Sequence, residues 1–445
     1  MNQTRVAIAV VLSLLIVGGW ISLLGGKAGE TSQLSELLEQ AQIEEARGLY
    51  EKAILSYEQV LSQSPKLERY EDLNRVYCAY YAKSHSSTVR RNYDNLLNRA
   101  CAAFPKETQF WETHVQLYME QSDYSKAVRL LQRAKERGIS SEYLEHAYQD
   151  AYYQFRVGYK TYPQIRPGCW SGCYVMQDSN GLWGLQTMDG SEMLTSIYAM
   201  MGPCSVAGTM AITDGDGVSW LIDSNGMLLV RYDETIEDAG CWSEGLVPVK
   251  TKGSDTWSYM EDSGAESLSG YLAAGSFYGG EAAVQTAAGW QIINENGETV
   301  SDAVWDEIRL DQTGAFVQNG CILAKDSSGW GIYDASWKEQ GEFRCDEIDI
   351  HVDGPIAFCR DGVWGFVSEK GQEVISPAYD QAHSFSNGVA AVCRNGLWGF
   401  IDGEGRQVLD FQFTQAGYFA PNGGGCPVQR AKDGAFEIIC WVVAR

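Results

Sequence analysis

The sequence is poor in histidine and lacks the motifs that mark common metal and catalytic sites. Its five histidines do not cluster with the cysteines, and no two cysteines have the spacing Cys-x-x-Cys. Zinc sites are usually built from Cys and His at such short spacings, so we expect no metal. No P-loop, Gly-x-Gly-x-x-Gly, Gly-x-Ser-x-Gly or His-Glu-x-x-His pattern occurs. We therefore expect no cofactor, and the sequence names no catalytic residue.

Basic residues are also scarce, and their deficit is confined to one part of the chain. The 445 residues include 34 Lys and Arg against 58 Asp and Glu, a net charge of -24. Residues 31–160 carry 17 basic and 18 acidic side chains, whereas residues 161–445 carry 15 and 39. An acidic surface repels phosphate backbones, so we expect no nucleic-acid partner. The step in charge predicts a domain boundary near residue 160.

One stretch near the N-terminus has no charge at all. Residues 6–26, VAIAVVLSLLIVGGWISLLGG, are 21 uncharged residues, and about 20 apolar residues span the hydrocarbon core of a bilayer. Arg5 precedes the stretch and Lys27 follows it, a bias that favours an N-terminus inside and the body of the chain outside. We predict a transmembrane anchor over 1–27 in a single-pass membrane protein. The alternative is a cleaved signal peptide and a secreted protein.

Residues 28–160 are predicted to be helical, because apolar residues recur at helical spacing and glycine is rare. In ARGLYEKAILSYEQVLSQSP (46–65), Gly48 is expected to end one helix. Ala53 is small where two helices cross closely, and Pro65 stops the second helix. The stretch 110–138 repeats this scheme with Ala127 in the place of Ala53, and 67–105 reads as a degenerate copy.

These offsets resemble the tetratricopeptide repeat family over about three units. The resemblance implies a concave groove that binds a peptide or a partner helix, and Glu112, Gln116 and Glu120 are expected to face it. The Lys and Asn clamp that some family members use for a C-terminal carboxylate is absent. The alternative is that the array serves as a spacer or a dimerisation surface.

The acidic part of the chain is built from a repeated phrase, best seen in GVWGFVSEKG (362–371) and GLWGFIDGEG (396–405). Its tryptophans follow one another at intervals of 37, 37, 33, 40, 34 and 34 residues, and a partial unit with Phe436 follows. A period of this size indicates a stacked or radial repeat. The tryptophans are Trp183, Trp220, Trp257, Trp290, Trp330, Trp364 and Trp398.

Each unit reads as short strands separated by tight turns. Asn395-Gly396 suits a two-residue hairpin turn, because both positions require positive φ. In the strand that follows, the absence of a side chain at Gly399, as at Gly365, leaves a trough that a ring from the neighbouring unit is expected to fill. We predict that the tryptophans are structural and join neighbouring units, since a buried indole covers about 150–250 Å².

The phrase resembles the WG (or KWG) repeat family, most closely over 355–388 and 389–422. The resemblance implies a β-repeat binding or scaffolding module and no catalytic residues. Leu221, Ser258 and Gln291 replace the glycine after Trp in the middle units, which departs from the family pattern.

We predict a β-propeller of about seven blades over 161–445, since a propeller has four-stranded blades and typically 4–8 of them. The partial last unit is expected to complete the first blade and close the ring. The alternative is a β-solenoid, which stacks its units in a line.

Acidic residues offer the only competing chemistry. Asp346, Glu347 and Asp349 lie close in sequence, and paired carboxylates would suit a carbohydrate-active propeller enzyme. The stretch TDGDGVSWLID (213–223) resembles a calcium loop only in part, because a glutamate at the last ligand position is missing. The pairs Tyr232-Asp233, Trp305-Asp306 and Tyr379-Asp380 recur at one place in the repeat, which indicates strand caps.

The sequence thus predicts a multidomain, membrane-anchored protein without enzymatic activity. Its anchor (1–27) precedes a helical array (28–160) and an all-β repeat domain (161–445). We expect it to bind a protein or peptide partner, or a cell-wall polymer, outside the cytoplasm.

Overall fold

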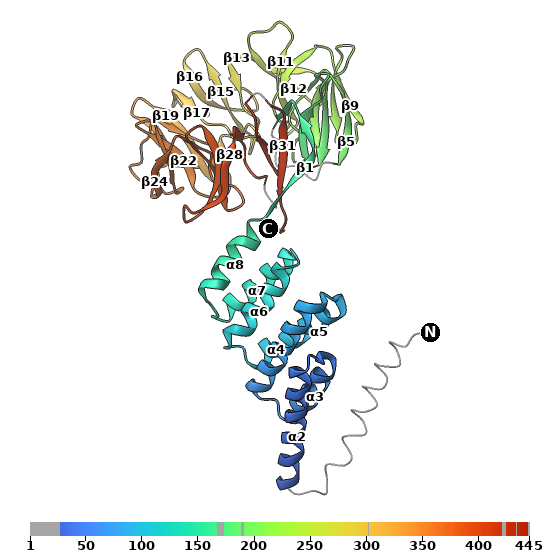
Figure 1. The fold of residues 1–445 in the computed structure, drawn as a ribbon. Helices are drawn as coiled ribbons and strands as arrows, with labels where there is room; N and C mark the ends of the chain where they lie inside the picture. The colour runs from blue at the N-terminus through green and yellow to red at the C-terminus, as the bar shows by residue number, and fades with distance from the viewer. Residues whose placement is uncertain are drawn as a thin grey trace. The chain divides into compact units, whose positions relative to one another are not determined.

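The computed structural model describes residues 27–166, 173–187, 191–300, 302–420, 424–432 and 434–443. The chain divides into two compact units, one that ends at Ala151 and one that begins at Tyr152 (Figure 1). The predicted membrane span at 6–26 lies outside the described residues. Within the described ranges, no helix combines the length and the apolar character needed to cross a membrane.

The described part of the first unit consists of seven helices, as the helical spacing predicted. From α2 to α7, each helix packs against the next one in the chain. The helices are α2 (Lys27–Ala46), α3 (Tyr50–Gln63), α4 (Leu67–Ser84), α5 (Ser87–Ala103), α6 (Thr108–Met119), α7 (Tyr124–Glu136) and α8 (Glu142–Tyr152).

Small residues sit where the array turns and where its helices cross. Gly48 follows the end of α2 with φ of +71°, a left-handed conformation that ends a helix, and the N–H of Leu49 bonds to the carbonyl of Glu44 across it. Ala53 and Ala127 have no exposed surface. They occupy the second helix of their hairpins, α3 and α7, at the positions where a larger side chain would push the helices apart.

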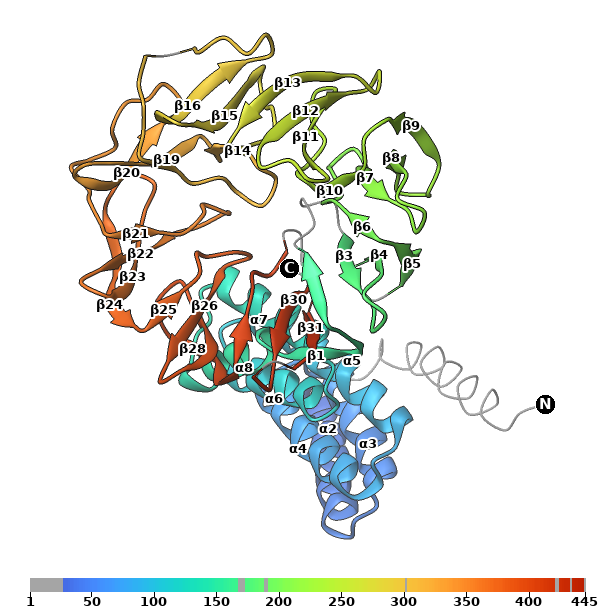
Figure 2. The ribbon, with the colours of Figure 1, turned by 90° about the horizontal axis from the view of Figure 1, so that it is seen from above.

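The second unit is a β-propeller of eight blades, each a small antiparallel sheet, arranged as a ring in Figure 2. The first four blades are β2 (Gln164–Arg166), β3 (Cys173–Gln177), β4 (Trp183–Thr187) and β5 (Glu192–Tyr198); β6 (Met200–Met201), β7 (Thr209–Thr213), β8 (Ser219–Asp223) and β9 (Leu228–Tyr232); β10 (Ile236–Ala239), β11 (Leu246–Thr251), β12 (Trp257–Glu261) and β13 (Glu266–Tyr271); and β14 (Ala273–Ala274), β15 (Glu281–Thr286) and β16 (Gly289–Asn294).

The remaining four blades follow in chain order, and the last one takes its fourth strand from the start of the unit. They are β17 (Glu307–Ile308), β18 (Val317–Gln318), β19 (Cys321–Asp326) and β20 (Gly329–Asp334); β21 (Glu347–Ile348), β22 (Ile356–Arg360), β23 (Val363–Val367) and β24 (Glu373–Tyr379); β25 (Gln381–Ala382), β26 (Val389–Arg394), β27 (Leu397–Asp402) and β28 (Gln407–Phe413); and β29 (Gln415–Ala416), β30 (Cys426–Gln429), β31 (Phe436–Trp441) and β1 (Phe155–Tyr162).

The ring closes differently from our prediction and has eight blades in place of about seven. The C-terminal unit does not complete the first blade. It forms the first three strands of an eighth blade, and β1 pairs antiparallel with β31 as the fourth. The outer edge of β31 would otherwise carry unpaired backbone groups, and β1 covers it. Residues 155–160, which the sequence placed in the helical domain, are therefore part of the propeller.

The apolar core of the propeller is divided among the gaps between neighbouring blades. One cluster of buried side chains bridges each adjacent pair, including the eighth and first blades. The predicted hairpin turn is confirmed, since Asn395 and Gly396 have φ of 55° and 76°. The strands are short and alternate across both covered faces, so each blade is stable only between its two neighbours.

Candidate functional site

A polar cluster forms where the innermost strands of the last four blades end. Arg309 follows β17, Asp349 follows β21, His383 follows β25, and Tyr418 lies two residues after β29. The four residues hold nearly the same place in successive repeats, so the ring brings their side chains toward one another. We call Arg309, Asp349, His383 and Tyr418 the axial cluster.

The carboxylate of Asp349 is the centre of this cluster. The hydroxyl of Tyr418 donates to it at 2.6 Å from both oxygens, and the backbone N–H of Ser384 donates at 2.7 Å. The Nδ1 atom of His383 lies 3.5 Å from Oδ2. Burial raises the pKa of Asp349, but the nearby His383 imidazole and the hydrogen bonds from Tyr418 and Ser384 outweigh it and hold that pKa below its usual value.

The opposite effect acts on Tyr418. Burial and the adjacent charge of Asp349 raise the pKa of its hydroxyl well above the usual value. Tyr418 therefore remains a hydrogen-bond donor throughout the physiological range, and Asp349 remains an ionised acceptor. The pair joins the sixth and eighth blades across the intervening seventh blade.

Flat or cationic side chains of the inner strands cover the faces of several repeat tryptophans. The His383 ring stacks on Trp398 with centroids 4.9 Å apart and planes at 15°. Arg309 lies over Trp330 at 4.7 Å, and Arg166 lies over Trp183 at 4.8 Å. Such cation–π and stacking contacts hold these side chains against the faces of the tryptophans.

The carboxylates that suggested a glycosidase each have a structural partner. Asp346 accepts the backbone N–H of Asp361, the turn residue between β22 and β23, at 2.7 Å. Glu347 pairs with Arg309 at 3.4 Å, and Asp349 belongs to the axial cluster. The equivalent of Asp346 in the next blade, Asp380, accepts the turn N–H of Asn395 at 2.6 Å. Of the recurring aspartates, Asp380 therefore caps a hairpin turn, as Asp346 does in the preceding blade.

The partial calcium-loop match at 213–223 forms ordinary turns. Asp214 accepts the N–H groups of Asp216 and Val218 within its own turn, and Asp223 does the same for Asn225 and Met227. Across the described ranges, no group of three or more His, Cys, Asp or Glu is arranged to hold a metal ion.

The repeat tryptophans mostly lie between blades. Trp183, Trp290, Trp330 and Trp398 are buried members of the inter-blade clusters. Trp220 and Trp364 are partly buried and pack against such clusters. Trp257 is half-buried and belongs to none of the clusters of described residues. Their contribution to stability stays a prediction.

The space beside the glycine after Trp is not filled by a ring from the neighbouring blade, as we expected, but by backbone of the same blade. A Cβ at Gly399 would lie 2.8 Å from the carbonyl oxygen of Leu409, and one at Gly365 would lie 2.7 Å from that of Ile375. Both contacts are to the backbone of the next strand in the same blade, where the register shifts. The trough is therefore filled by a β-bulge of the next strand, and not by a ring from the neighbouring blade.

The middle blade with Leu221 supports this reading of the glycine. There the residues Ser219, Trp220 and Leu221 pair in regular register with Tyr232, Arg231 and Val230. In this blade the side chain after Trp coincides with a strand that does not bulge at this position, whereas in the third blade the register still shifts between Trp257 and Ser258.

The predicted groove residues form one row on α6. Glu112 is half-buried, and Gln116 and Glu120 are exposed. The side-chain amide of Gln116 donates to Glu120 at 3.0 Å. The same helix buries Phe110 and Trp111 on its other side. The row is therefore accessible and polar, as a binding surface requires.

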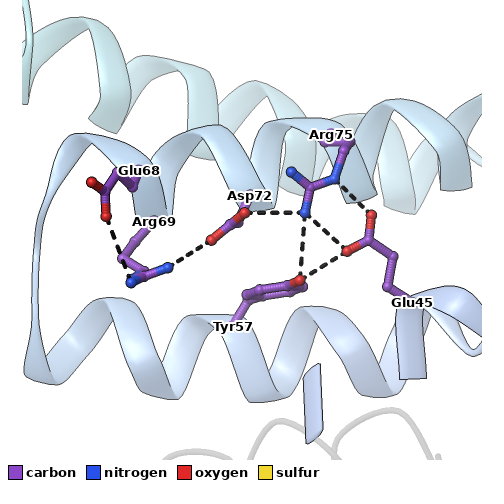
Figure 3. A network of polar contacts seen from close by, with 6 residues as sticks. All are labelled: Glu45, Tyr57, Glu68, Arg69, Asp72 and Arg75. Atoms are coloured by element: carbon purple, nitrogen blue, oxygen red, sulfur yellow. Dashed lines mark hydrogen bonds and ion pairs between the residues drawn. The ribbon is translucent and has the colours of Figure 1, made fainter. Parts of the chain in front are cut away.

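A second polar feature of the array joins its first three helices (Figure 3). Arg75 on α4 binds Glu45 of α2 at 2.8 Å and Asp72 at 3.0 Å, and Tyr57 of α3 donates to Glu45. Asp72 also pairs with Arg69. The hydrogen bond from Arg75 lowers the pKa of Glu45. The network fixes the helices, and its charges are already paired.

The sequence did not predict the axial cluster, although Asp349 was among the carboxylates it singled out. Arg309, Asp349, His383 and Tyr418 are four different residue types at similar repeat positions, so no recurring motif marks them. The sequence did contain one signal for the cluster. Each of the four residues follows the short strand that precedes a Trp hairpin, so the repeat alignment places them at equivalent positions.

Comparisons with known proteins agree with the repeat pattern. The model of the WG containing repeat family matches residues 364–398 and 398–426. No curated protein matches the chain. The matched residues run from β23 in the sixth blade to the start of β30 in the eighth, so this part of the propeller carries WG repeats.

Several solved structures are similar at low sequence identity. BamB from Moraxella catarrhalis is 15% identical, with 62% of this chain and 93% of that chain covered and a TM-score of 0.41. The WD40 domain of SCAP from fission yeast is 7% identical, with 65% and 97% covered and a TM-score of 0.39. The Sgt2 TPR domain from Aspergillus fumigatus is 20% identical, with 27% and 76% covered and a TM-score of 0.21.

Proposed function

We propose that this protein is a non-enzymatic scaffold that binds a protein partner through its helical array. The row of Glu112, Gln116 and Glu120 carries the proposal. It is an accessible polar stripe on a helix whose opposite side is buried, and its acceptors suit a partner that presents basic or amide groups. The WG-repeat propeller adds an acidic surface that suits a second contact, with a protein or a cell-wall polymer.

The proposal includes attachment to a membrane, with the described units on its outer side. It rests on the uncharged run 6–26 and on Arg5 before it. Fractionation of cells that express the full chain, or a chain lacking 6–26, tests it. The full chain is expected in the membrane fraction and the shortened chain in the soluble fraction.

The binding role is tested by reversing charge on the α6 row. Partners are captured from an envelope extract on the immobilised full chain and identified, and their affinity is then measured with purified components. Glu112→Lys with Glu120→Lys is expected to weaken binding about tenfold or more, as loss of charged contacts does. Glu36→Lys with Glu39→Lys on α2 makes the same change of charge at exposed positions and should leave the affinity within about twofold. Equal loss in both variants would count against the groove.

The enzymatic alternative has less support. Asp346, Glu347 and Asp349 serve a turn, an ion pair and the axial cluster, respectively. An enzyme would lose turnover of a glycan when one of these carboxylates is changed to its amide, whereas a scaffold would keep its affinity for the partner. Release of sugar by the wild-type protein that Asp349→Asn abolishes would overturn the scaffold proposal.

A further inference from the structure

A basic pocket opens in the helical array between α5, α6 and α7. It has a volume of about 380 Å³ and is separate from the row of Glu112, Gln116 and Glu120, none of which lines it. We call it the α5–α7 pocket. Its lining residues are Ser87, Thr88, Arg90, Arg91, Asp94, Leu117, Tyr118 and Lys126.

The arginines of this pocket differ from the other arginines of α4 and α5. Arg69, Arg75 and Arg99 each form ion pairs, with Asp72, with Glu45 and with Glu58. Arg90 and Arg91 form no ion pair with any residue that the structure describes. Arg90 and Arg91 are thus the two arginines of α4 and α5 whose guanidinium groups have no acidic partner among the described residues.

The only acidic residue that lines the pocket already accepts hydrogen bonds from side chains of the array. Asp94 accepts hydrogen bonds from Nε2 of His114 at 2.7 Å and from the hydroxyl of Tyr118 at 2.5 Å. His114 is buried, with 1% of its surface exposed. Asp94 thus directs its Oδ1 atom to His114 and Tyr118, and its side chain is 31% exposed.

Lys126 completes the basic wall. Its ammonium group pairs with Asp123 at 2.6 Å and lies 5.6 Å from the centre of the Tyr118 ring. The pocket therefore combines two unpaired guanidinium groups with the hydroxyls of Ser87 and Thr88, all of which donate hydrogen bonds. Every one of these groups favours an acceptor with negative charge.

We propose that the α5–α7 pocket binds the carboxylates of an acidic peptide segment in the protein partner. Neighbouring residues on a helix point about 100° apart, so Arg90 and Arg91 approach the pocket from different directions and suit two carboxylates. Each guanidinium can bind a carboxylate with two parallel hydrogen bonds. The volume is near the lower end of the range for ligand sites, about 300–1,000 Å³, and accommodates a few side chains. The inference deepens the proposed function, because it adds a second contact chemistry on the same array.

The test uses the full chain and a fluorescein-labelled hexaglutamate peptide, with hexaglutamine as the neutral peptide. Fluorescence anisotropy is expected to show binding of hexaglutamate that weakens as salt rises, because salt screens the charges. Arg90→Gln with Arg91→Gln should weaken it about tenfold or more, since both substitutions remove charge-assisted hydrogen bonds to the carboxylates. Arg47→Gln with Lys52→Gln removes the same charge at exposed positions outside the pocket and should change the affinity less than about twofold.

Three outcomes would overturn the proposal. They are equal loss in the two double variants, equal binding of hexaglutamate and hexaglutamine, and displacement of the peptide by inorganic phosphate at equal concentration, which would indicate a site for small anions. Circular dichroism of the variants establishes that the array remains folded. The proposed function is separable, because a partner that binds the Arg90→Gln, Arg91→Gln variant with wild-type affinity would exclude this pocket and leave the α6 row in place.

Discussion

Gly399→Ala tests why tryptophan is followed by glycine in this repeat. A Cβ at this position would lie 2.8 Å from the carbonyl oxygen of Leu409 and 3.0 Å from the nitrogen of Phe411. Both atoms belong to the bulged backbone of β28. Pairs of Trp398 with Phe413 and of Phe400 with Leu409 hold that backbone on either side of the bulge. It cannot move aside as the end of a flexible side chain would.

The expected cost follows from this geometry. Forcing one extra methyl group into a packed site costs about 1–3 kcal/mol. Replacing glycine also restricts the unfolded chain, which stabilises the folded state by about 0.4–1 kcal/mol. The difference of these two ranges is about 0–2.6 kcal/mol, and their midpoints give a net destabilisation of about 1.3 kcal/mol. For a large domain each kcal/mol shifts the melting temperature by about 2 °C, so we expect a decrease of about 2–4 °C.

Gly403→Ala is the matched control in the same blade. A Cβ at Gly403 meets no atom within 4 Å, and its φ lies outside the left-handed region. Because both variants change glycine to alanine, the difference between their melting temperatures isolates the clash with β28. Differential scanning calorimetry of the full chain measures it. If Gly399→Ala melts at the temperature of Gly403→Ala or above, the bulge does not explain the glycine.

Three further predictions concern the tryptophans, the axial cluster and Asp94 of the α5–α7 pocket. Trp330→Ala should cost about 3–5 kcal/mol, because Trp330 has no exposed surface in the cluster between the fifth and sixth blades. The half-buried Trp257, changed likewise, should cost less in the same calorimetric measurement. The lowered pKa of Asp349 means that its contribution to stability is present above about pH 4 and is lost as the pH falls through the folded-state pKa. Asp349→Asn should flatten the pH dependence of the melting temperature between about pH 5 and 3, and an unchanged profile would contradict the assignment. Tyr118→Phe removes one donor to Asp94 and should destabilise the array by about 1–3 kcal/mol in urea unfolding, whereas no change would mean that the bond is not formed in solution.

Local physical signals in the sequence predicted the helical array and the repeat well. Gly48 is needed for its left-handed conformation and Ala53 for its small size where two helices cross. Both requirements arise within one helical hairpin, so both roles could be predicted from the sequence alone. The trough beside Gly399 shows the limit of this reasoning. A glycine shows that space is needed on one side of the strand, but ring and backbone can both fill that space, and only the register of β28 decides between them.

The axial cluster and the blade number depend on the closed ring, which no local signal specifies. Asp349 and Tyr418 are 69 residues apart, and they meet only because blades of similar size return each inner strand to the same axis. The sequence analysis did not predict that β1 completes an eighth blade, because β1, FRVGYKTY, has neither the Trp-Gly pair nor a turn of the repeat type. Its place is set by the unpaired edge of β31.

The closing blade therefore differs physically from the other seven. Most of β1 is exposed, with only its end residues partly buried. Among the described residues, the cluster between the eighth and first blades has Tyr174, Met176 and Ile438 as its buried members, whereas the neighbouring cluster around Trp398 and Trp441 is far larger. Apolar burial is the main cohesive term between blades. Opening of the ring should thus begin where β1 meets β31.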